Sequence, residues 1–416
     1  MRTAKFPSTA WFDRLTTDGI DMCKRLSIAL LFLCAIPAWA ADPPALAPRI
    51  GVMTMQPGEI FFERFGHDAI VVLDTQTGEA TSYNFGFFDM DEPDFVARFA
   101  YGDMQYYLVA LPLQQDLSYY REVGRGVKLQ WLDLPPEQAK GLAAALAERA
   151  KPENARYHYD YFISNCSTQV RDALNAAMGG SLKPQMVGRS RGNTFRSEAV
   201  RLVSPVPWMW LGFDIGLGPY ADVPMSRWEE AYVPMRLADS LREAKNAAGR
   251  PLVQAEEVLV EHRIAPEPAE QPRRWWPWLL TGLAAAALIV LLAPRKPRLI
   301  LAFAMPFWLA CGIVGTLLVF LWGFTEHQAA WANRNLLLMS PLCLLLIPGA
   351  IPLLRKRTPS AWFRWLSVIV AFFAVLAWIV HWLPFAPQYN QSWVALLLPV
   401  HLALAYVFFP QSSLLR

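Results

Sequence analysis

Five long apolar runs near the C-terminal end constrain the fold of this chain most strongly. They cover residues 275–293, 299–322, 335–354, 362–383 and 393–409. Each run is close to the ~20 residues that a helix needs to cross the hydrocarbon core of a bilayer. The composition agrees, because 54% of the residues are hydrophobic and 17 are Trp. The sequence therefore predicts an all-α membrane domain of five helices.

The charges on the connections between these runs predict how the domain is oriented. The connections “PRKPR” (294–298) and “RKRTPS” (355–360) are strongly basic, whereas the connections at 323–334 and 384–392 are poor in basic residues. Basic connections tend to stay on the cytoplasmic side of a membrane. The pattern therefore places residues 41–270 and both weakly charged connections on the outer side, with the C-terminus inside.

The N-terminus carries an export signal. A basic pair is followed by a short apolar core (26–36) and by “AWA” (38–40), which is a small-x-small cleavage site. These features predict a signal peptide over residues 1–40 that is cleaved after its last residue, with a start codon downstream of residue 1. An uncleaved membrane anchor is the alternative. The signal peptide and the charge pattern both place residues 41–270 on the exported side.

Residues 41–270 are predicted to form an α+β domain. Alternation of apolar and polar residues predicts strands, and proline starts followed by good helix formers predict helices. The predicted strands are “HDAIVVLD” (67–74), “TSYNFGFF” (81–88), “MQYYLVALPL” (104–113) and “GVKLQWLDL” (126–134), and the predicted helices are “EPDFVARFAYG” (92–102), “PPEQAKGLAAALAERA” (135–150) and “NCSTQVRDALNAAMGG” (165–180). Residues 181–272 are rich in Pro, Gly, Trp and Arg, and their pattern assigns no elements.

Several classes of ligand are not expected. The sequence has no zinc-finger spacing and no phosphate-binding glycine loop, and its basic residues form no stripe for a nucleic acid. We therefore expect no metal, no cofactor and no nucleic-acid partner.

Cys166 is the candidate nucleophile. The remaining cysteines all lie in apolar segments, so no disulfide with Cys166 is expected: Cys23, Cys34, Cys311 and Cys343. Cys166 stands near the start of a predicted helix, directly after Asn165 at its N-terminal end. Free N–H groups and the helix dipole at such a position favour a thiolate.

A histidine at the start of a predicted strand is the candidate base. His67 opens “HDAIVVLD”, and an imidazole beside a thiol can accept its proton. His158, eight residues before Cys166, is the competing candidate. A structural role for His67 is the simplest alternative.

These motifs resemble known families. “GHDAIVV” followed much later by “NCSTQVRDAL” resembles the circularly permuted branch of the NlpC-type, papain-like thiol enzymes, in which the His strand precedes the Cys helix. More closely, “FGHDAI”, “YNFGFF”, “YFISNCSTQVRD” and “TEHQAAWANRNLLLMSPL” resemble the Lnb-type family of bacterial membrane proteins, from about residue 50 to about residue 405. The resemblance implies a permuted papain-like periplasmic domain followed by the membrane helices.

The resemblance also implies roles for individual residues. Cys166 matches the nucleophile of the family and His67 matches its base. The third, orienting group of the permuted fold comes from the next strand, where Asn84 and Tyr83 are the candidates. Related acyltransferases carry a His there, which this strand lacks. A buried, hydrogen-bonded Asn84 with a purely structural role is the alternative.

The activity implied by the resemblance is acyl transfer at the inner membrane of a Gram-negative cell. A phospholipid would donate an acyl chain through a Cys166 thioester, and the N-terminal amine of a diacylglyceryl lipoprotein would accept it. Two alternatives stay open. One is a periplasmic cysteine peptidase or amidase that acts on peptidoglycan, and the other is a non-enzymatic envelope sensor or binding protein in which Cys166 is a small buried hydrophobe.

Other polar and aromatic residues are candidates for substrate binding. The candidates near the thiol and in the outer connection are Tyr83, Asn165, His327, Asn333 and Asn335. Glu326 lies beside them, and simple solvation at the end of a membrane helix is the alternative for this group. “YHYDYF” (157–162) forms either an acyl pocket or part of the core. Arg171 and Asp172 are predicted to be a pair on the surface of the helix.

Overall fold

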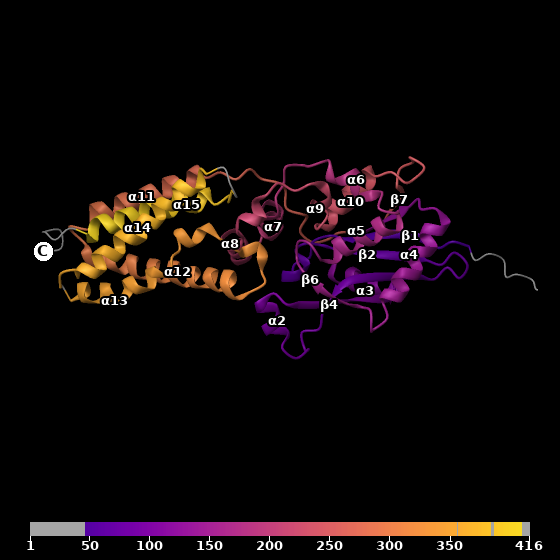
Figure 1. Cartoon of the computed structure of the whole chain (residues 1–416), viewed down its shortest axis with the longest axis horizontal. Coiled ribbons are helices and arrows are strands. Elements are labelled where there is room, and N and C mark those ends of the chain that lie inside the picture. The colour runs from indigo at the N-terminus through magenta and orange to yellow at the C-terminus, as the bar shows by residue number, and fades with distance from the viewer. Residues whose placement is uncertain (1–45, 356, 384–386, 410–416) are drawn as a thin grey trace, which may run out of the picture. The chain divides into compact units, whose positions relative to one another are not determined.

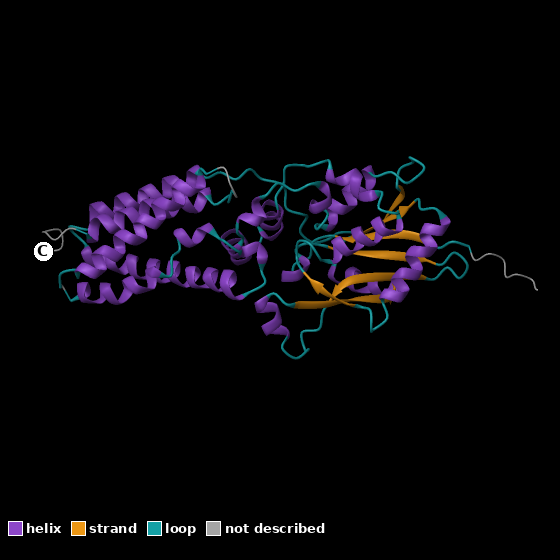
Figure 2. Cartoon of the chain, viewed as in Figure 1, coloured by secondary structure: helices purple, strands orange, loops and turns teal. Residues whose placement is uncertain are grey.

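The computed structural model of the chain describes residues 46–355, 357–383 and 387–409 (Figure 1). The predicted signal peptide lies outside these residues. The described residues from Ala47 onward form one compact unit. Within it, all described strands belong to residues 49–260, and the region beyond residue 275 is helical (Figure 2).

One antiparallel sheet forms the centre of the N-terminal region. Its described strands are β1 (Arg49–Met55), β2 (His67–Leu73), β3 (Ala80–Phe87), β4 (Met104–Pro112), β5 (Val127–Leu132), β6 (Arg156–Tyr159) and β7 (Val253–Val260), in the order β6-β4-β3-β2-β1-β5-β7. The four strands predicted from alternation are confirmed. β1, β6 and β7 were not predicted. The mixed α/β architecture agrees with the expected α+β class, whereas the permuted papain-like fold stays a prediction.

Different helices cover the two faces of the sheet. Helix α3 (Leu113–Val123) packs against Ala69 and Val71 of β2 on one face. Ile70 points to the other face and joins a core that α4 (Pro136–Arg149), α5 (Cys166–Ala177) and α10 (Pro234–Glu243) complete. Since side chains alternate along a strand, His67 shares the α3 face with Ala69, and Asp68 shares the α5 face with Ile70.

Helix α5 starts where the sequence predicts. The side chain of Asn165 accepts a hydrogen bond from the N–H of Thr168, and the Thr168 side chain accepts one from the N–H of Asn165. This capping box satisfies two N–H groups that the helix itself cannot satisfy. Cys166 is therefore the first residue of α5. The helix ends before Gly179 and Gly180, whose φ angles are 63° and 82° and suit glycine.

Residues 181–272 form a second group of short helices. They are α6 (Leu182–Val187), α7 (Phe195–Val203), α8 (Pro207–Gly216), α9 (Arg227–Glu230) and α10, followed by β7. Capping boxes start α7 and α9, and proline starts α8 and α10. Arg196 is buried, pairs with Asp222 at 2.8 Å and donates to the carbonyl oxygens of Asp214 and Leu217. This buried arginine holds the turn after α8 in place.

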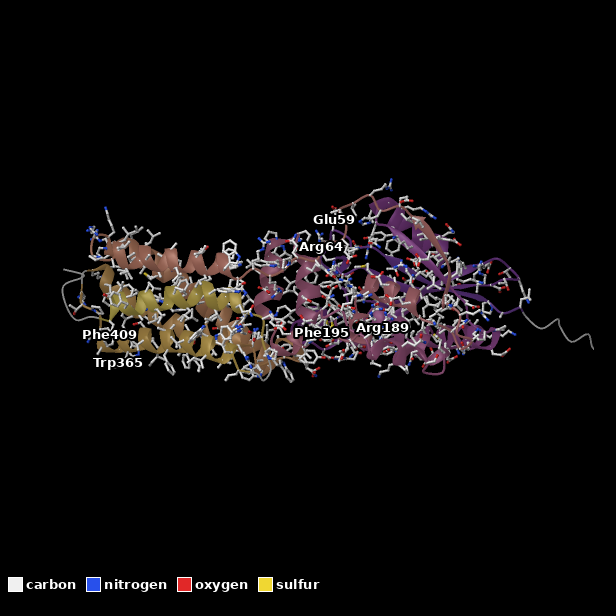
Figure 3. All side chains as sticks on the ribbon, turned by 90° about the horizontal axis from the view of Figure 1, so that it is seen from above. Glu59, Arg64, Arg189, Phe195, Trp365 and Phe409 are labelled. Atoms are coloured by element: carbon white, nitrogen blue, oxygen red, sulfur yellow. The ribbon has the colours of Figure 1, made fainter. Side chains whose placement is uncertain are left out.

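The C-terminal region is built from apolar helices. They are α11 (Trp276–Leu292), α12 (Pro297–Phe324), α13 (Leu342–Leu354), α14 (Ala361–His381) and α15 (Gln391–Phe408). Four described helical segments are long and apolar enough to cross a membrane, namely 297–324, 334–354, 361–381 and 391–408. Helix α11 is shorter, with 17 residues. Ring contacts join these helices, including the edge-on pair Trp365 and Phe409 at 5.7 Å (Figure 3).

The fifth span stays a prediction that topology can test. We expect α11 to cross the membrane as well, since 17 helical residues extend about 26 Å, close to the thickness of the hydrocarbon core. Alkaline phosphatase fused after residue 265 should be active, and the same enzyme fused to the C-terminus should be inactive. An active phosphatase at the C-terminus would mean that only four helices cross.

Candidate functional site

The start of α5 lies against the start of β2. The Ser167 hydroxyl is 2.7 Å from Asp68 Oδ2, so the residue after Cys166 contacts the residue after His67. Strand β3 passes close to the thiol at this point, because a Cβ built on Gly86 would lie in contact with the Cβ of Cys166, at 3.6 Å. The φ angle of Gly86 is 91°, which a residue with a side chain adopts only with strain. The thiol therefore lies at the end of the sheet where β2 begins.

The thiol of Cys166 is protonated at neutral pH. Burial is the main cause that raises the pKa of Cys166 to about 12, and the Asp68 carboxyl raises it further. Backbone hydrogen bonds from Asp68 and Ser167 lower the pKa of Cys166, but by less. The helix start favours a thiolate, as expected, but it does not bring the pKa of Cys166 down to neutral pH. The side chain is 9% exposed, so desolvation outweighs the N–H groups.

The ring of His67 is fixed by an amide. Nε2 of His67 lies 3.1 Å from Oδ1 of Asn84. The amide of Asn84 is oriented in turn, because its Nδ2 donates to Asp116 Oδ2 at 2.9 Å. An amide oxygen only accepts, so Nε2 carries the ring proton and Nδ1 keeps its lone pair. The arrangement leaves Nδ1 as the atom that can accept a proton.

The imidazole of His67 is neutral at physiological pH. Burial is the largest cause that lowers the pKa of His67 to about 4, and the charge of Arg125 lowers it further. Asp116 and the hydrogen bond to Asn84 act in the opposite direction. A neutral imidazole is the form that acts as a base. Direct contact between its ring and the Cys166 thiol stays a prediction.

Asn84, rather than Tyr83, contacts the histidine. Tyr83 points to the opposite face of the sheet and packs in the core beside α5. Asn84 is 2% exposed and connects His67 to Asp116, which also lies 2.7 Å from the hydroxyl of Ser82. The hydrogen bonds agree with an orienting role for Asn84, and the catalytic part of that role stays a prediction.

Asp68 is a buried carboxylic acid. Besides Asp68 Oδ2, the Ser167 hydroxyl lies 2.7 Å from the carbonyl oxygen of Ala231. A hydroxyl has a single proton, and a carbonyl oxygen can only accept. The Ser167 hydroxyl therefore shares its proton between Asp68 and the Ala231 carbonyl oxygen. Burial raises the pKa of Asp68 to about 7, although hydrogen bonds from Ser167 and Thr54 lower it.

The outer connection between α12 and α13 reaches the segment before α5. The ring of His327 stacks on Tyr161, and its Nδ1 is hydrogen-bonded to the Tyr161 hydroxyl. Nε2 of His327 contacts the carbonyl oxygen of Ala100, at the end of α2 (Phe95–Tyr101), at 3.2 Å. Glu326 donates its N–H to Tyr101. The connection is therefore attached to the domain that carries the thiol.

Three predicted substrate-binding residues have structural contacts. Asn333 Nδ2 donates to the carbonyl oxygens of Ile215 and Gly216 at 2.8 and 2.9 Å, and Asn335 Nδ2 donates to that of Ile215 at 2.9 Å. Both asparagines are buried, so simple solvation does not describe them. The amide of Asn165 is used for capping and for the carbonyl oxygen of Tyr232. Substrate binding by these residues stays a prediction, and their contacts favour a structural role.

The aromatic segment before the thiol belongs to the core and the sheet. Tyr157 and Tyr159 lie on β6, and Tyr159 packs against Tyr106 of β4 at 4.3 Å between ring centroids. The competing base, His158, has a side chain that is 50% exposed. Its ring lies 3.7 Å from Glu326, and its carbonyl oxygen accepts a hydrogen bond from Ser164, just before the Cys helix.

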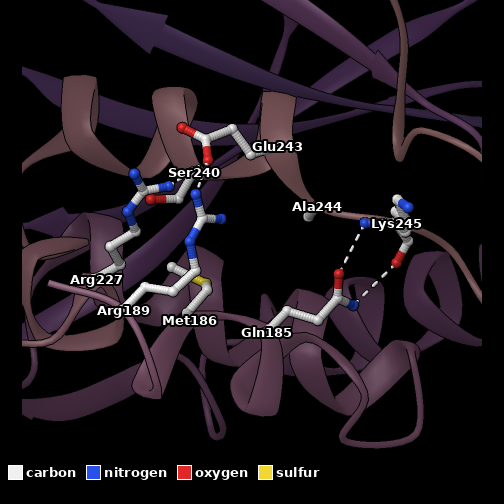
Figure 4. Close-up of a pocket in the computed structure, with 8 residues that line it drawn as sticks. All are labelled: Gln185, Met186, Arg189, Arg227, Ser240, Glu243, Ala244 and Lys245. Carbon is white, nitrogen blue, oxygen red and sulfur yellow. Dashed lines mark hydrogen bonds and ion pairs between the residues drawn. The ribbon is translucent and has the colours of Figure 1, made fainter.

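Other features of the structure lie outside this site. Arg171 pairs with Asp172 but is buried and not on the surface, and its guanidinium lies 4.0 Å over the ring of Trp228. A pocket of about 160 Å³ lies beside α6 and the end of α10, where Glu243 pairs with Arg189 and Arg227 (Figure 4). None of the candidate residues lines this pocket.

Sequence reasoning missed several residues of the site. Asp68, Asp116 and Arg125 have buried ionisable side chains. Asp68 contacts β1, Asp116 contacts β3, and Arg125 contacts the segment just after β1. Arg125 pairs with Glu63 at 3.1 Å and donates to the carbonyl oxygen of Gln56. Asp68 was within reach of the sequence, since it follows the candidate histidine and begins an otherwise apolar run. Asp116 and Arg125 gave no such signal.

The protonation of Asp68 predicts a pH-dependent stability. The carboxyl ionises near pH 3.8 in the unfolded chain but only near pH 7 in the folded one. The folded state therefore binds more protons between these values, and the free energy of unfolding should fall as the pH rises from about 4 to about 7. Asp68→Asn should remove this loss, by up to about 4 kcal/mol relative to the wild type at high pH.

Melting curves of the purified full chain in detergent, from pH 4 to pH 8, measure this effect. Asp91→Asn is the matched control, because Asp91 is exposed. The control should follow the wild type. If Asp68→Asn follows it as well, Asp68 is already ionised across the range.

Two family models match the chain. The Lnb N-terminal periplasmic domain matches residues 37–196, and the Lnb transmembrane domain matches residues 272–412. Comparison with curated proteins and with solved structures found no match. The two matched ranges cover most of the chain and contain both the strand that starts at His67 and the helix that starts at Cys166. The chain therefore belongs to the Lnb family, and it is an inner-membrane protein with a periplasmic N-terminal domain.

Proposed function

We propose that this protein is a thiol acyltransferase that moves an acyl chain from a phospholipid to the N-terminal amine of a diacylglyceryl lipoprotein. The observation that carries the proposal is the position of Cys166. It is the first residue of α5, it accepts hydrogen bonds from the N–H groups of Asp68 and Ser167, and it lies at the end of the strand that begins with His67.

The first half of the reaction forms a thioester. His67 Nδ1 accepts the thiol proton while the sulfur of Cys166 attacks the ester carbonyl carbon of the donor. Because both groups rest in their neutral forms, the proton moves during the attack and no stored ion pair is needed. The N–H groups near the sulfur are placed to stabilise the negative oxygen of the tetrahedral intermediate. The glycerol oxygen then leaves with the proton that His67 returns.

The second half transfers the chain to the acceptor. The neutral α-amine of the lipoprotein attacks the thioester carbonyl, and His67 accepts a proton from the attacking nitrogen. The carbon–sulfur bond breaks, and the sulfur of Cys166 regains its proton from His67. The products are an amide on the lipoprotein and a free thiol, so the enzyme returns to its starting state without a cofactor.

The surroundings of the site favour a lipid substrate over a polar peptide. The η1 turn (Phe61–Glu63), which comes shortly before β2, exposes Phe61 and Phe62. The outer connection of the membrane domain reaches Tyr161, five residues before Cys166. A peptidase that acts on peptidoglycan would instead need an open polar groove and would not need the membrane domain. The burial of Cys166 also fits the non-enzymatic alternative, which substitution of the thiol separates from the proposal.

The thiol and the imidazole should both be essential. We expect Cys166→Ser and His67→Ala each to lower acyl transfer by at least about 100-fold, since each removes the nucleophile or its base. The measurement is mass analysis of lipoproteins in a strain that depends on this chain for N-acylation. His158→Ala is the matched control and should keep full activity. Full activity of Cys166→Ser would exclude the thioester mechanism.

A trapping experiment separates transfer from hydrolysis. Incubation of the purified enzyme with phospholipid alone should give an acyl group on Cys166 that hydroxylamine removes. Release of free fatty acid at the same rate with and without an acceptor amine would identify a hydrolase instead.

His327 should act through position and not through chemistry. His327→Phe keeps a ring that can stack on Tyr161 but removes the hydrogen bonds to Tyr161 and Ala100. We expect acyl transfer to fall by about 10- to 100-fold, because displacement of a reacting group by ~1 Å has that effect. Gln328→Ala, an exposed change in the same connection, is the control. The rate at which a small alkylating agent modifies Cys166 should stay unchanged, and full transfer activity of His327→Phe would make the connection a simple linker.

A further inference from the structure

Helix α8 exposes an apolar surface outside the membrane helices. Residues 204–213, “SPVPWMWLGF”, contain no charged residue. Trp208 is 65% exposed and Leu211 is 39% exposed, and residues three apart lie on one face of a helix. The side chain of Met209 points inward and is buried. A helix of the periplasmic region thus presents Trp and Leu where an ordinary surface helix presents charge.

The inner side of α8 packs on the outer ends of two membrane helices. The ring of Trp210 lies 6.1 Å from that of Trp278, near the start of α11, and 6.4 Å from that of Trp393, near the start of α15. Both helices start on the periplasmic side, because α11 follows the periplasmic domain and α15 follows an outer connection. Tryptophan is enriched at the level of lipid headgroups. These contacts place α8 beside the periplasmic ends of α11 and α15.

Polar contacts fix the orientation of α8. Asp214, the charged residue near its end, accepts a hydrogen bond from Trp393 Nε1 at 2.9 Å and pairs with Arg273. The carbonyl oxygen of Ile215 accepts from Asn333 and from Asn335. These contacts attach the end of α8 to the membrane domain.

The η1 turn continues the same surface. Phe61 stacks on Trp208, with ring centroids 6.1 Å apart and planes 11° apart. Ile60, Phe61 and Phe62 are each between 42% and 49% exposed. The turn ends shortly before His67, so the surface leads from the membrane interface toward the start of β2. We call Ile60, Phe61, Phe62, Trp208 and Leu211 the α8 surface.

We propose that the α8 surface is inserted into the outer leaflet of the inner membrane and contacts phospholipid acyl chains there. Phospholipid is the occupant because α8 packs, through Trp210, on Trp278 and Trp393 near the starts of two membrane helices, which brings the α8 surface beside the membrane. Insertion removes large aromatic side chains from water, which stabilises the inserted state in proportion to the apolar area buried. This inference does not depend on acyl transfer, because it concerns where the domain lies and not what it catalyses.

Fluorescence quenching in proteoliposomes tests the proposal. The full chain is reconstituted in phosphatidylethanolamine and phosphatidylglycerol with an environment-sensitive probe on Leu211→Cys or on Phe61→Cys. Val258→Cys is the matched control, because Val258 is 54% exposed on β7 and lies outside the α8 surface. The described native cysteines are buried, and the labelled parent chain gives their background. Melting temperatures equal to that of the parent confirm that each variant is folded.

Lipids brominated near the headgroup should quench the probes at positions 211 and 61 at least about threefold more strongly than the probe at position 258, and aqueous iodide should show the opposite order. Equal lipid quenching at positions 211 and 258 would overturn the proposal. Protection of position 211 from both quenchers would also overturn it, since that result would identify a protein partner and not lipid as the occupant. Two separate labelling positions keep the test valid if one variant fails to fold.

Discussion

The contact between Asp68 and Ser167 is the interaction on which the site depends. It joins two residues 99 positions apart and brings the start of α5 against the start of β2. Burial makes a charged carboxylate at that depth costly, and hydrogen bonds from Ser167 and Thr54 offset part of that cost. The Ser167 hydroxyl also contacts the carbonyl oxygen of Ala231, in the turn before α10. One buried acid thereby connects the sheet, the Cys helix and the segment before α10.

Burial also sets the chemistry of the two reacting groups. The same desolvation that raises the pKa of Cys166 lowers the pKa of His67, so both groups are uncharged at neutral pH. A position at a helix start is not enough to ionise a thiol when burial excludes water from it. The hydrogen bonds from His67 to Asn84 and from Asn84 to Asp116 fix which nitrogen of the imidazole carries the proton. They keep the lone pair of the imidazole on Nδ1. In the proposed mechanism, proton transfer to this atom accompanies attack on the substrate.

The polar residues at the outer ends of the membrane helices join the two regions of the chain. Asn333 and Asn335 use their amides on carbonyl oxygens at the end of α8, where the helix itself leaves these oxygens without partners. His327 makes a similar attachment to Tyr161 and to the end of α2. These contacts make the membrane domain more than an anchor. They attach the periplasmic domain to the outer ends of the membrane helices, as the proposed reaction of a lipid substrate at the thiol requires.

The sequence by itself determined the features that are written in consecutive residues. Alternation located β2 and β3, the Asn165 cap located the start of α5 at Cys166, and the length of the apolar runs located the membrane domain. The family resemblance is confirmed by the matching models. It supported the prediction that His67 is the base that acts on Cys166. The sequence did not predict the helices of residues 181–272, because they are short. The capping boxes at Thr194 and Ser226 were local signals for two of these helices.

Only the tertiary structure decided the rest, because it depends on residues that are distant in the chain. The partner of Asp68 is in another element, and so are those of Asn84 and of His327. The ionisation of the thiol depends on how much water these elements exclude, which no local pattern records. For the same reason the sequence suggested that polar residues near His327 are solvated or bind substrate, whereas folding buries two of them against α8. The residues were visible in the sequence, but their surroundings were fixed only when the chain folded.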